Sequence, residues 1–429
     1  MSSTEPSTGV DAGASIDARL AAAGLPPLPR TAWLALDLDA LAGNLAVVRD
    51  LAGPAVPVHP VVKADAYGHG AVPIARALEA AGADGFCVAA LDEALALRAG
   101  GIRAPIRVLY PIPPSGAADA ATAEIAVAVG DPAGLDALLV AVADGPGPGA
   151  EHGAVPRPAL QLELEVETGL GRGGVLPADL VALVERLLAT PGVRLTGLWT
   201  HLQASEDEPR TTTQLAVFDA AAAAVRAAGH DLPTRHVAAS GGLLTDVVAL
   251  DGVRPGLLVY GLVPDELDEH DLPAEVLASV RPVLSLHARP VRVVDLPTGH
   301  GVSYGPTWTA PRPSRIATLP LGYGDGFSRA FSNRAAALVR GRRVPSVGNV
   351  AMDATMVDVT DVPGPPVTID DTVTLIGSQG GERITVGELA RLRNTNQWEV
   401  VTAMARRLPR VYHSPAAPVG LRTLIVEAE

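Results

Sequence analysis

Lysine occurs only once in this chain, and its side chain is well suited to covalent chemistry with a carbonyl group. The 429 residues include 33 lysines and arginines, and Lys63 is the single lysine, so the other 32 are arginines. A lysine amine can lose its proton, attack a carbonyl carbon and form a Schiff base, whereas a guanidinium stays protonated. Two interpretations are open. Lys63 is a nucleophile, or it is the remnant of a composition that otherwise favours arginine.

The residues around Lys63 favour the first interpretation. The apolar residues 60–64 are typical of a buried strand, and Lys63 lies at the C-terminal end of that strand. The turn Gly68-His69-Gly70 then leads into a helix, and Tyr67 adds a hydroxyl beside it. In a barrel of alternating strands and helices, catalytic groups collect at the C-terminal ends of the strands.

Such a barrel is what residues 33–279 predict. Short apolar runs alternate with alanine-rich amphipathic stretches at a spacing of about 25 to 35 residues. We expect strands at residues 60–64, 85–89, 106–109, 125–128, 160–166, 195–200 and 234–238, with two more near Leu36 and Val253. We expect helices at residues 71–81, 92–99, 177–189 and 213–228. The strand number comes close to eight, which suits an α/β (β/α)8 barrel of the TIM type better than an open sheet.

The remaining residues predict a mainly β C-terminal domain. After residue 281 the pattern changes to short segments of period two separated by Gly and Pro. Strands are expected within residues 283–294, 337–339 and 372–376, and helices at residues 386–393 and 398–406. We therefore divide the chain into a flexible extension (1–30), a barrel (31–279) and a β domain (280–429). The Gly/Pro-rich residues 144–158 are expected to form a surface insertion.

Composition narrows the class of function. A net charge of -14 and a pI near 5.2 argue against nucleic-acid and anionic-membrane partners, which favour basic surfaces. The single cysteine, Cys87, cannot form an internal disulfide, and no Cys/His cluster suggests a metal site. The sequence shows neither an apolar run long enough to span a membrane nor a secretory signal. These features favour a cytoplasmic enzyme that acts on a small molecule.

The segment Val62-Lys63-Ala64-Asp65-Ala66-Tyr67-Gly68-His69-Gly70 resembles the cofactor-lysine motif of alanine racemases, which use pyridoxal 5'-phosphate (PLP). Further similar segments follow in the order found in that family, and together they cover nearly the whole chain. They are Thr168-Gly169-Leu170-Gly171-Arg172, Thr200-His201, Ser240, Arg254-Pro255-Gly256, Tyr260-Gly261, Val302-Ser303-Tyr304-Gly305, Gly322-Tyr323-Gly324-Asp325-Gly326, Met352-Asp353 and Pro409-Arg410-Val411-Tyr412.

The resemblance implies a pair of acid/base groups. Lys63 would hold PLP and serve as one base, and Tyr304 from the partner subunit of a homodimer would serve as the other. Racemisation removes the alpha proton from one face of the substrate and returns a proton to the opposite face, so two bases must flank a planar intermediate. The alternative for Tyr304 is a buried aromatic residue of the β domain.

The resemblance also implies how the cofactor and the substrate are held. Arg254 would face the pyridine nitrogen, with His201 holding Arg254 from behind. A guanidinium only donates hydrogen bonds, so it would leave that nitrogen unprotonated and weaken the electron sink. The remaining contacts are a phosphate site of Tyr67, Ser240, Gly256, Leu257 and Trp398, and a substrate site of Arg172, Tyr323, Met352 and Asp353. Arg172 would also contact the PLP phenolic oxygen.

The chain departs from the family at four positions. Glu165 stands where many relatives carry a carbamylated lysine, seven residues before the arginine, and its carboxylate could supply the same charge. Ala239 replaces an asparagine, Asn349 replaces an arginine, and Trp398 replaces a phosphate-binding tyrosine. An indole N–H can still donate one hydrogen bond, but with a different reach. These changes leave PLP binding as the expectation and open the question of the substrate.

The sequence therefore favours a homodimeric, PLP-dependent racemase that interconverts L- and D-alanine and supplies D-alanine for peptidoglycan. A racemase for another small amino acid, or a member of the family from a specialised pathway, is the main alternative. A decarboxylase of the same plan would be expected to carry a cysteine in the second domain, whereas Cys87 lies in the barrel. A barrel that only binds PLP would need neither a second domain nor Tyr304.

Overall fold

The computed structural model describes residues 15–144, 158–232, 234–247, 249–267, 272–415, 417–425 and 427–428. The chain divides into two compact units. The barrel unit comprises Ala42–Ala66 and Ala71–Arg281. The β unit comprises the described residues within Met1–Leu41, Tyr67–Gly70 and Pro282–Glu429. The barrel unit ends at Arg281, and the described residues before Ala42 group with the β unit.

The barrel unit is a closed ring of parallel strand pairings. Six strands pair in sequential order: β2 (Phe86–Val88), β3 (Ile106–Val108), β4 (Ile125–Val129), β5 (Leu160–Glu165), β6 (Val193–Trp199) and β7 (Arg235–His236). Parallel bridges close the ring at Val61–Cys87, Ala239–Arg254 and Val58–Val253. The segments around residues 58–61 and 253–254 thus supply the two remaining strand positions. The eightfold barrel expected from the sequence is confirmed.

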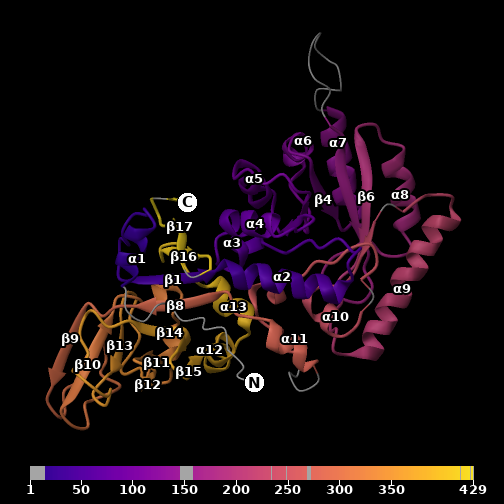
Figure 1. Cartoon of the computed structure of the whole chain (residues 1–429). Helices are drawn as coiled ribbons and strands as arrows, with labels where there is room; N and C mark the ends of the chain where they lie inside the picture. The colour runs from indigo at the N-terminus through magenta and orange to yellow at the C-terminus, as the bar shows by residue number, and fades with distance from the viewer. Residues whose placement is uncertain are drawn as a thin grey trace, which may run out of the picture. The chain divides into compact units, whose positions relative to one another are not determined.

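Helices lie around these parallel strands (Figure 1). They are α2 (Leu38–Ala52), α4 (Ala71–Ala80), α5 (Leu91–Ala99), α6 (Ala117–Thr122), α7 (Pro132–Asp144), α8 (Leu180–Leu188), α9 (Glu208–Ala227), α10 (Ser240–Leu244) and α11 (Ala274–Ser279). In α8 the buried residues Leu180, Leu183, Val184 and Leu187 follow helical spacing, which gives one apolar face. Helix α9 begins after Asp207, whose carboxylate accepts the Arg210 amide as an N-cap.

The β unit contains two sheets. The larger has the strand order β12-β11-β14-β8-β1-β16-β17-β18, with β15 paired to β14, and the smaller has the order β13-β10-β9. The strands are β1 (Ala32–Asp37), β8 (Leu284–Ala288), β9 (Arg292–Leu296), β10 (Ser314–Leu319), β11 (Ala336–Val339), β12 (Arg342–Pro345), β13 (Thr355–Asp358), β14 (Val373–Gln379), β15 (Glu382–Ile384), β16 (Arg410–His413), β17 (Pro418–Arg422) and β18 (Glu427–Ala428). Helices α12 (Val386–Arg393) and α13 (Gln397–Thr402) complete the unit. The mainly β character that the sequence predicts is confirmed.

The strand near Leu36 was expected in the barrel, and this expectation is wrong. Strand β1 pairs in parallel with β16 and antiparallel with β8, so it lies in the centre of the larger sheet of the β unit. Leu34 and Leu36 are fully buried there. An apolar strand pattern reports burial but does not say which sheet provides the neighbours.

The extension expected over residues 1–30 is partly a packed helix. Helix α1 (Ile16–Ala22) begins at Ser15, whose hydroxyl accepts the Ala18 amide. Ile16 and Leu20 are buried in a core cluster with Trp33, Val411 and Leu421. Residues 1–14 lie outside the described residues, as does nearly all of the insertion expected at residues 144–158.

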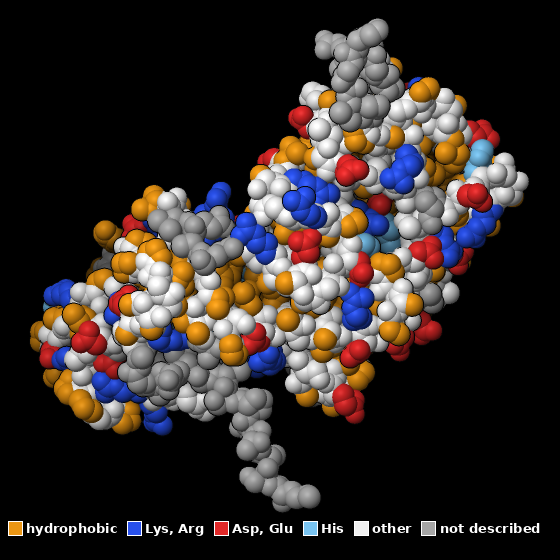
Figure 2. Space-filling view, turned by 45° about the horizontal axis from the view of Figure 1, so that its top comes forward, with side chains coloured by type: hydrophobic (Ala, Val, Ile, Leu, Met, Phe, Trp, Pro, Cys, Tyr) orange, Lys and Arg blue, Asp and Glu red, His pale blue; other side chains and the backbone are white. Residues whose placement is uncertain are grey.

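The surface agrees with the composition. On the face drawn in Figure 2, acidic side chains and arginines are interspersed, and the chain carries a net charge of -14. No helix among the described residues is long and apolar enough to cross a membrane. The described residues also contain no group of three or more His, Cys, Asp or Glu side chains that could hold a metal ion.

Candidate active site

Lys63 is followed by a left-handed turn. Ala64, Asp65, Ala66 and Tyr67 all have positive φ, between 50 and 55°. Such a conformation costs roughly 1–2 kcal/mol per residue that is not glycine. Hydrogen bonds hold the turn in place: the Ala64 amide donates to Glu93 Oε1 (2.6 Å), and the Ala71 amide donates to Asp65 Oδ1 (2.9 Å). The fold thus maintains a strained backbone directly after the only lysine.

The end of this turn is anchored in the β unit. Arg410 donates from Nε and Nη2 to the Gly68 carbonyl (3.0 and 2.8 Å), and the Tyr412 hydroxyl donates to the His69 carbonyl (3.0 Å). At Gly70, where φ is 101°, an added Cβ would lie 2.1 Å from the Tyr412 hydroxyl. Glycine is required there by both backbone conformation and space. This explains the glycine turn noted in the sequence.

The Lys63 amine is half-buried near two other charged groups. Its Nζ lies 6.0 Å from the centre of the Tyr110 ring, and Arg172 Cζ lies 5.3 Å from the same ring. Burial and then the Arg172 charge lower the pKa of Lys63, while Glu93 opposes the shift. A lowered pKa increases the fraction of neutral amine, which is the form that attacks a carbonyl. The environment therefore suits the chemistry expected of Lys63.

Tyr110 and Glu93 were not identified in the sequence analysis. Tyr110 comes directly after the predicted strand 106–109, at the end where catalytic groups collect, so its position was a usable signal. Glu93 lies in the first turn of α5 and reaches the residue after Lys63. Because that contact joins distant parts of the chain, local sequence does not predict it.

Arg254 is buried in the barrel, with only 2% of its surface exposed. Its Nη2 donates to the Thr200 and Val237 carbonyls (2.9 and 3.2 Å), and its Nη1 hydrogen bonds to His236 Nδ1. The guanidinium also lies over the Trp199 ring at 4.9 Å. Within the described part of the chain, Arg254 Nε makes no hydrogen bond and remains a free donor. A charged group held this firmly is suited to orienting a ligand.

The side chain that contacts Arg254 is His236, not the expected His201. Both histidines belong to the barrel unit, but the imidazole hydrogen bond to Arg254 comes from His236 on β7. Burial lowers the pKa of His201 to about 3, and the Arg254 charge adds to the shift. His201 is therefore neutral near Arg254, and its role toward a cofactor remains a prediction. The signal for His236 in the sequence is its position inside the predicted strand 234–238.

Glu165, the last residue of β5, lies beside Arg172, the pairing that the family resemblance implied. Glu165 Oε1 is 3.7 Å from Arg172 Nη2. Burial raises the pKa of Glu165, and the Arg172 charge opposes this shift. The glutamate thus places a carboxylate beside the Arg172 guanidinium.

Ser240 forms a small cradle with the segment after Arg254. The amides of Gly256 and Leu258 donate to Ser240 Oγ at 2.8 and 3.2 Å. The Leu257 amide, between them, has no hydrogen-bond acceptor among the described residues. Ser240 begins α10, and Leu257 begins the 3-10 helix η2 (Leu257–Tyr260). Because the Gly256 amide already donates to Ser240 Oγ, it could bind an anion directly only if that hydrogen bond were broken.

The other expected site residues belong to the β unit. Tyr304, Met352 and Tyr323 are 76%, 53% and 42% exposed, although all three side chains are large and hydrophobic. Asp353 is exposed, Trp398 on α13 is half-buried, and Tyr67 is buried. Exposed aromatic and methionine side chains are typical of a surface that meets a partner. The assembly of these residues with Lys63 into one active site remains a prediction.

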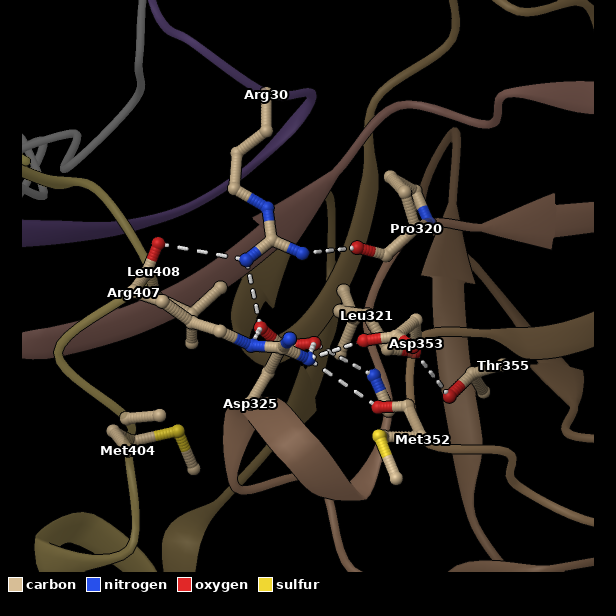
Figure 3. Close-up of polar contacts among 12 residues, drawn as sticks. Arg30, Pro320, Leu321, Asp325, Met352, Asp353, Thr355, Met404, Arg407 and Leu408 are labelled. Carbon is tan, nitrogen blue, oxygen red and sulfur yellow. Dashed lines mark hydrogen bonds and ion pairs between the residues drawn. The ribbon is translucent and has the colours of Figure 1, made fainter. Parts of the chain in front are cut away.

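A buried acid organises the turns that carry Tyr323 and Met352 (Figure 3). Arg407 contacts both Asp325 oxygens (2.7 and 3.0 Å), and Arg30 contacts Asp325 Oδ1 (2.7 Å). Arg407 also reaches Asp353 Oδ1 at 2.6 Å. Asp325, which is fully buried, accepts the Gly322 amide at 3.0 Å as well. Four chain segments are thereby fixed by one charge network.

Models of the alanine racemase N-terminal and C-terminal domains match residues 36–264 and 283–412. The chain belongs to the alanine racemase family. The alanine racemase of Symbiobacterium thermophilum is 40% identical over 401 residues, which are 90% of this chain and 98% of that protein. As a member of this family, the chain is an enzyme of the isomerase class.

Solved structures of the alanine racemase family have the same fold. The structure of alanine racemase from Bacillus anthracis with bound L-Ala-P has a TM-score of 0.83 and 31% identity, and the match covers 93% of this chain and 99% of that one. The histidine racemase from Leuconostoc mesenteroides subsp. sake has a TM-score of 0.78 and is also 31% identical, over 90% of this chain and 99% of that one. The family fold thus occurs in proteins named for different amino acids.

Proposed function

We propose that this protein is a PLP-dependent racemase that interconverts L- and D-alanine. The observation that carries the proposal is the surrounding of Lys63: a single lysine of lowered pKa at the C-terminal end of a barrel strand position, close to Arg172. Similarity to proteins named alanine racemase over about 90% of the chain supports the choice of substrate.

The donors of the barrel unit fit PLP. Lys63 would hold the aldehyde carbon, and the free Nε donor of Arg254 would meet the pyridine nitrogen. The Ser240 hydroxyl and the Leu257 amide suit the phosphate, because hydroxyls and backbone amides are common phosphate donors. The family resemblance adds Tyr67 and Trp398 to the phosphate site and places His201 beside the ring. PLP supplies the electron-withdrawing ring that acidifies the alpha proton of the substrate.

The chain itself supplies the bases and the substrate contacts. Lys63 would take or return the alpha proton on one face of the substrate, and the partner subunit's Tyr304 would act on the other face. Arg172, oriented by Glu165, would bind the substrate carboxylate together with the Met352 amide. Tyr323 and Asp353 would line the entrance. The exposure of Tyr304 supports a homodimer with shared sites, since this side chain is not used within its own chain's core.

The test is proton exchange in deuterated water. Purified protein loaded with PLP is incubated with single L-amino acids, and alpha deuterium and optical rotation are measured. Alanine should gain deuterium and lose optical activity faster than serine or histidine. Release of carbon dioxide or of a keto acid as the main product would reject racemisation.

The substrate has one specific alternative. The similar structure named histidine racemase, together with the departures at Ala239, Asn349 and Trp398, supports a racemase for another amino acid. In the same deuterium experiment, faster exchange of that amino acid than of alanine would favour this alternative.

Racemisation of alanine would supply D-alanine for peptidoglycan in the cytoplasm, in agreement with an acidic chain that has one cysteine.

Two variants separate the roles of the two bases. Lys63→Ala should abolish the visible absorbance that PLP gains on covalent attachment to a lysine. Tyr304→Phe should keep this absorbance and lose most turnover, because only proton transfer on the second face is removed. Full activity of Tyr304→Phe would show that the two-base assignment is wrong.

A further inference from the structure

Three buried side chains and the half-buried Arg107 form a series of contacts across the barrel interior. Arg107 on β3 contacts Glu163 on β5 with Nε 2.8 Å from Oε1. The other Glu163 oxygen, Oε2, lies 3.2 Å from His236 Nε2. His236 Nδ1 in turn contacts Arg254. Glu163, His236 and Arg254 are each no more than 3% exposed, so solvent does not substitute for these contacts.

The donors and acceptors of these four side chains allow only one arrangement of the hydrogen bonds between them. An ionised carboxylate only accepts and a guanidinium only donates. His236 must therefore donate from Nε2 to Glu163 and accept at Nδ1 from Arg254. A neutral imidazole with its proton on Nε2 satisfies both contacts. A proton on Nδ1 would instead face the Arg254 guanidinium, with a donor against a donor.

The surrounding residues hold His236 and Glu163 in position. The Trp199 ring stacks on the His236 ring with centroids 6.0 Å apart and planes 9° from parallel. At Gly197 on β6, a Cβ atom would lie 2.9 Å from Glu163 Cδ, so the glycine provides room for the carboxylate. Burial alone would raise the pKa of Glu163, but the Arg107 charge and the hydrogen bond from His236 outweigh it and lower this pKa, so the carboxylate stays ionised. Burial, with the Arg254 charge, lowers the pKa of His236 to about 4.

We propose that Arg107 and Glu163 are positioning residues that act on Arg254 through His236. Glu163 fixes the neutral tautomer of His236 that carries its proton on Nε2, and Arg107 holds the Glu163 carboxylate. His236 then accepts from Arg254 Nη1, which leaves Nε free to meet a ligand. The identity of that ligand, a pyridine nitrogen, rests on the proposed function, whereas the tautomer does not.

The tautomer can be read directly. Nitrogen NMR of the PLP-loaded protein with labelled histidine distinguishes a protonated from an unprotonated ring nitrogen, and a His236→Asn variant assigns the His236 signals among the ten histidines. We expect His236 to be neutral with its proton on Nε2. An imidazolium, or a proton on Nδ1, would overturn the proposal without any further variant.

Glu163→Gln tests the cause. An amide at this position can donate to Nε2 of His236 as well as accept from it, so the single tautomer of His236 should be lost. The signals of His287, which lies on β8 in the β unit, should stay unchanged. Glu185→Gln, on the exposed face of α8, is the matched control and should leave the His236 signals as in the wild type. An unchanged tautomer in Glu163→Gln would contradict the role of Glu163.

A double variant keeps the test valid if Glu163→Gln folds poorly. Replacing both charges of a buried pair with apolar side chains is often close to neutral for stability, so Arg107→Met with Glu163→Leu should fold. Its racemase kcat should fall about tenfold, with a rise in the share of keto acid among the products, because Arg254 is no longer fixed. A wild-type ratio of products would reject the proposal. If the wild-type protein racemised no amino acid, the proposed function would be rejected. The proposal about the His236 tautomer would still be tested, because NMR measures the tautomer without any turnover.

Discussion

Glu165 Oε1 and Arg172 Nη2 lie 3.7 Å apart at the C-terminal end of β5. The Glu165 side chain is 9% exposed and the Arg172 side chain is 40% exposed, so the acid is the fixed partner and the arginine is the adjustable one. A carboxylate placed behind an arginine limits the orientations of its guanidinium. This geometry supports Glu165 as the residue that orients Arg172 for a substrate carboxylate.

Neutralising this acid should therefore weaken substrate binding. Glu165→Gln is expected to lower kcat/KM about tenfold, which corresponds to about 1.4 kcal/mol. Steady-state kinetics of racemisation measures the change, with Glu185→Gln as a control of equal charge change on the surface. Added bicarbonate should have no effect on the wild type, because no lysine is present at this position to be carbamylated. An unchanged kcat/KM would show that Arg172 is oriented by other groups.

The single lysine allows its protonation to be measured without interference. In protein labelled with carbon-13 lysine, one side-chain signal is expected, and its pH titration gives the pKa of Lys63. Arg172→Ala should raise this pKa, because the Arg172 charge lowers it, and Glu93→Gln should lower it further, because the Glu93 charge raises it. Shifts in the same direction for both variants would contradict the electrostatic account. The titration is made before PLP is added, since attachment removes the free amine.

The network around Asp325 should contribute to the stability of the β unit. Asp325→Asn leaves Arg407 and Arg30 without their buried carboxylate, and we expect a loss of about 3 kcal/mol in the free energy of unfolding. Asp295→Asn is the matched control, because Asp295 pairs with Arg315 but is 76% exposed; a loss below about 1 kcal/mol is expected there. Denaturant unfolding measures both. Equal losses would mean that burial of Asp325 has no special effect.

Acid should destabilise the protein through His287. Burial lowers the pKa of His287 to about 4 from 6.5, and the nearby His413 and Arg19 add to the shift. Below pH 6.5 the unfolded chain binds a proton that the folded chain does not, so this histidine's contribution to stability is complete above pH 6.5 and is lost as the pH falls toward 4. His287→Gln should reduce the slope of unfolding free energy against pH in this window by up to about 1.4 kcal/mol per pH unit. A slope equal to that of the wild type would contradict the shift.

Local patterns in the sequence predicted much of the fold. The helix expected at residues 386–393 occurs with those bounds, and the strands expected around residues 106–109 and 160–166 occur within one residue. The periodicity of apolar residues and the positions of Gly and Pro at the ends of elements are local properties, so neighbouring residues are enough to predict them. Strand β1 was assigned to the barrel because its apolar pattern is the same whichever sheet buries it.

The sequence by itself determined the chemistry available to this protein: one amine that can form a Schiff base, an ordered set of family motifs, and an acid seven residues before Arg172. Only the tertiary structure decided which histidine meets Arg254, since His201 and His236 are both plausible partners in sequence. It also decided that Glu93 holds the turn after Lys63 and that Tyr110 lies beside the amine. The reason is physical. Residue types fix what a group can donate, accept or attack, but distances between groups far apart in the chain are set by packing of the strands that carry them.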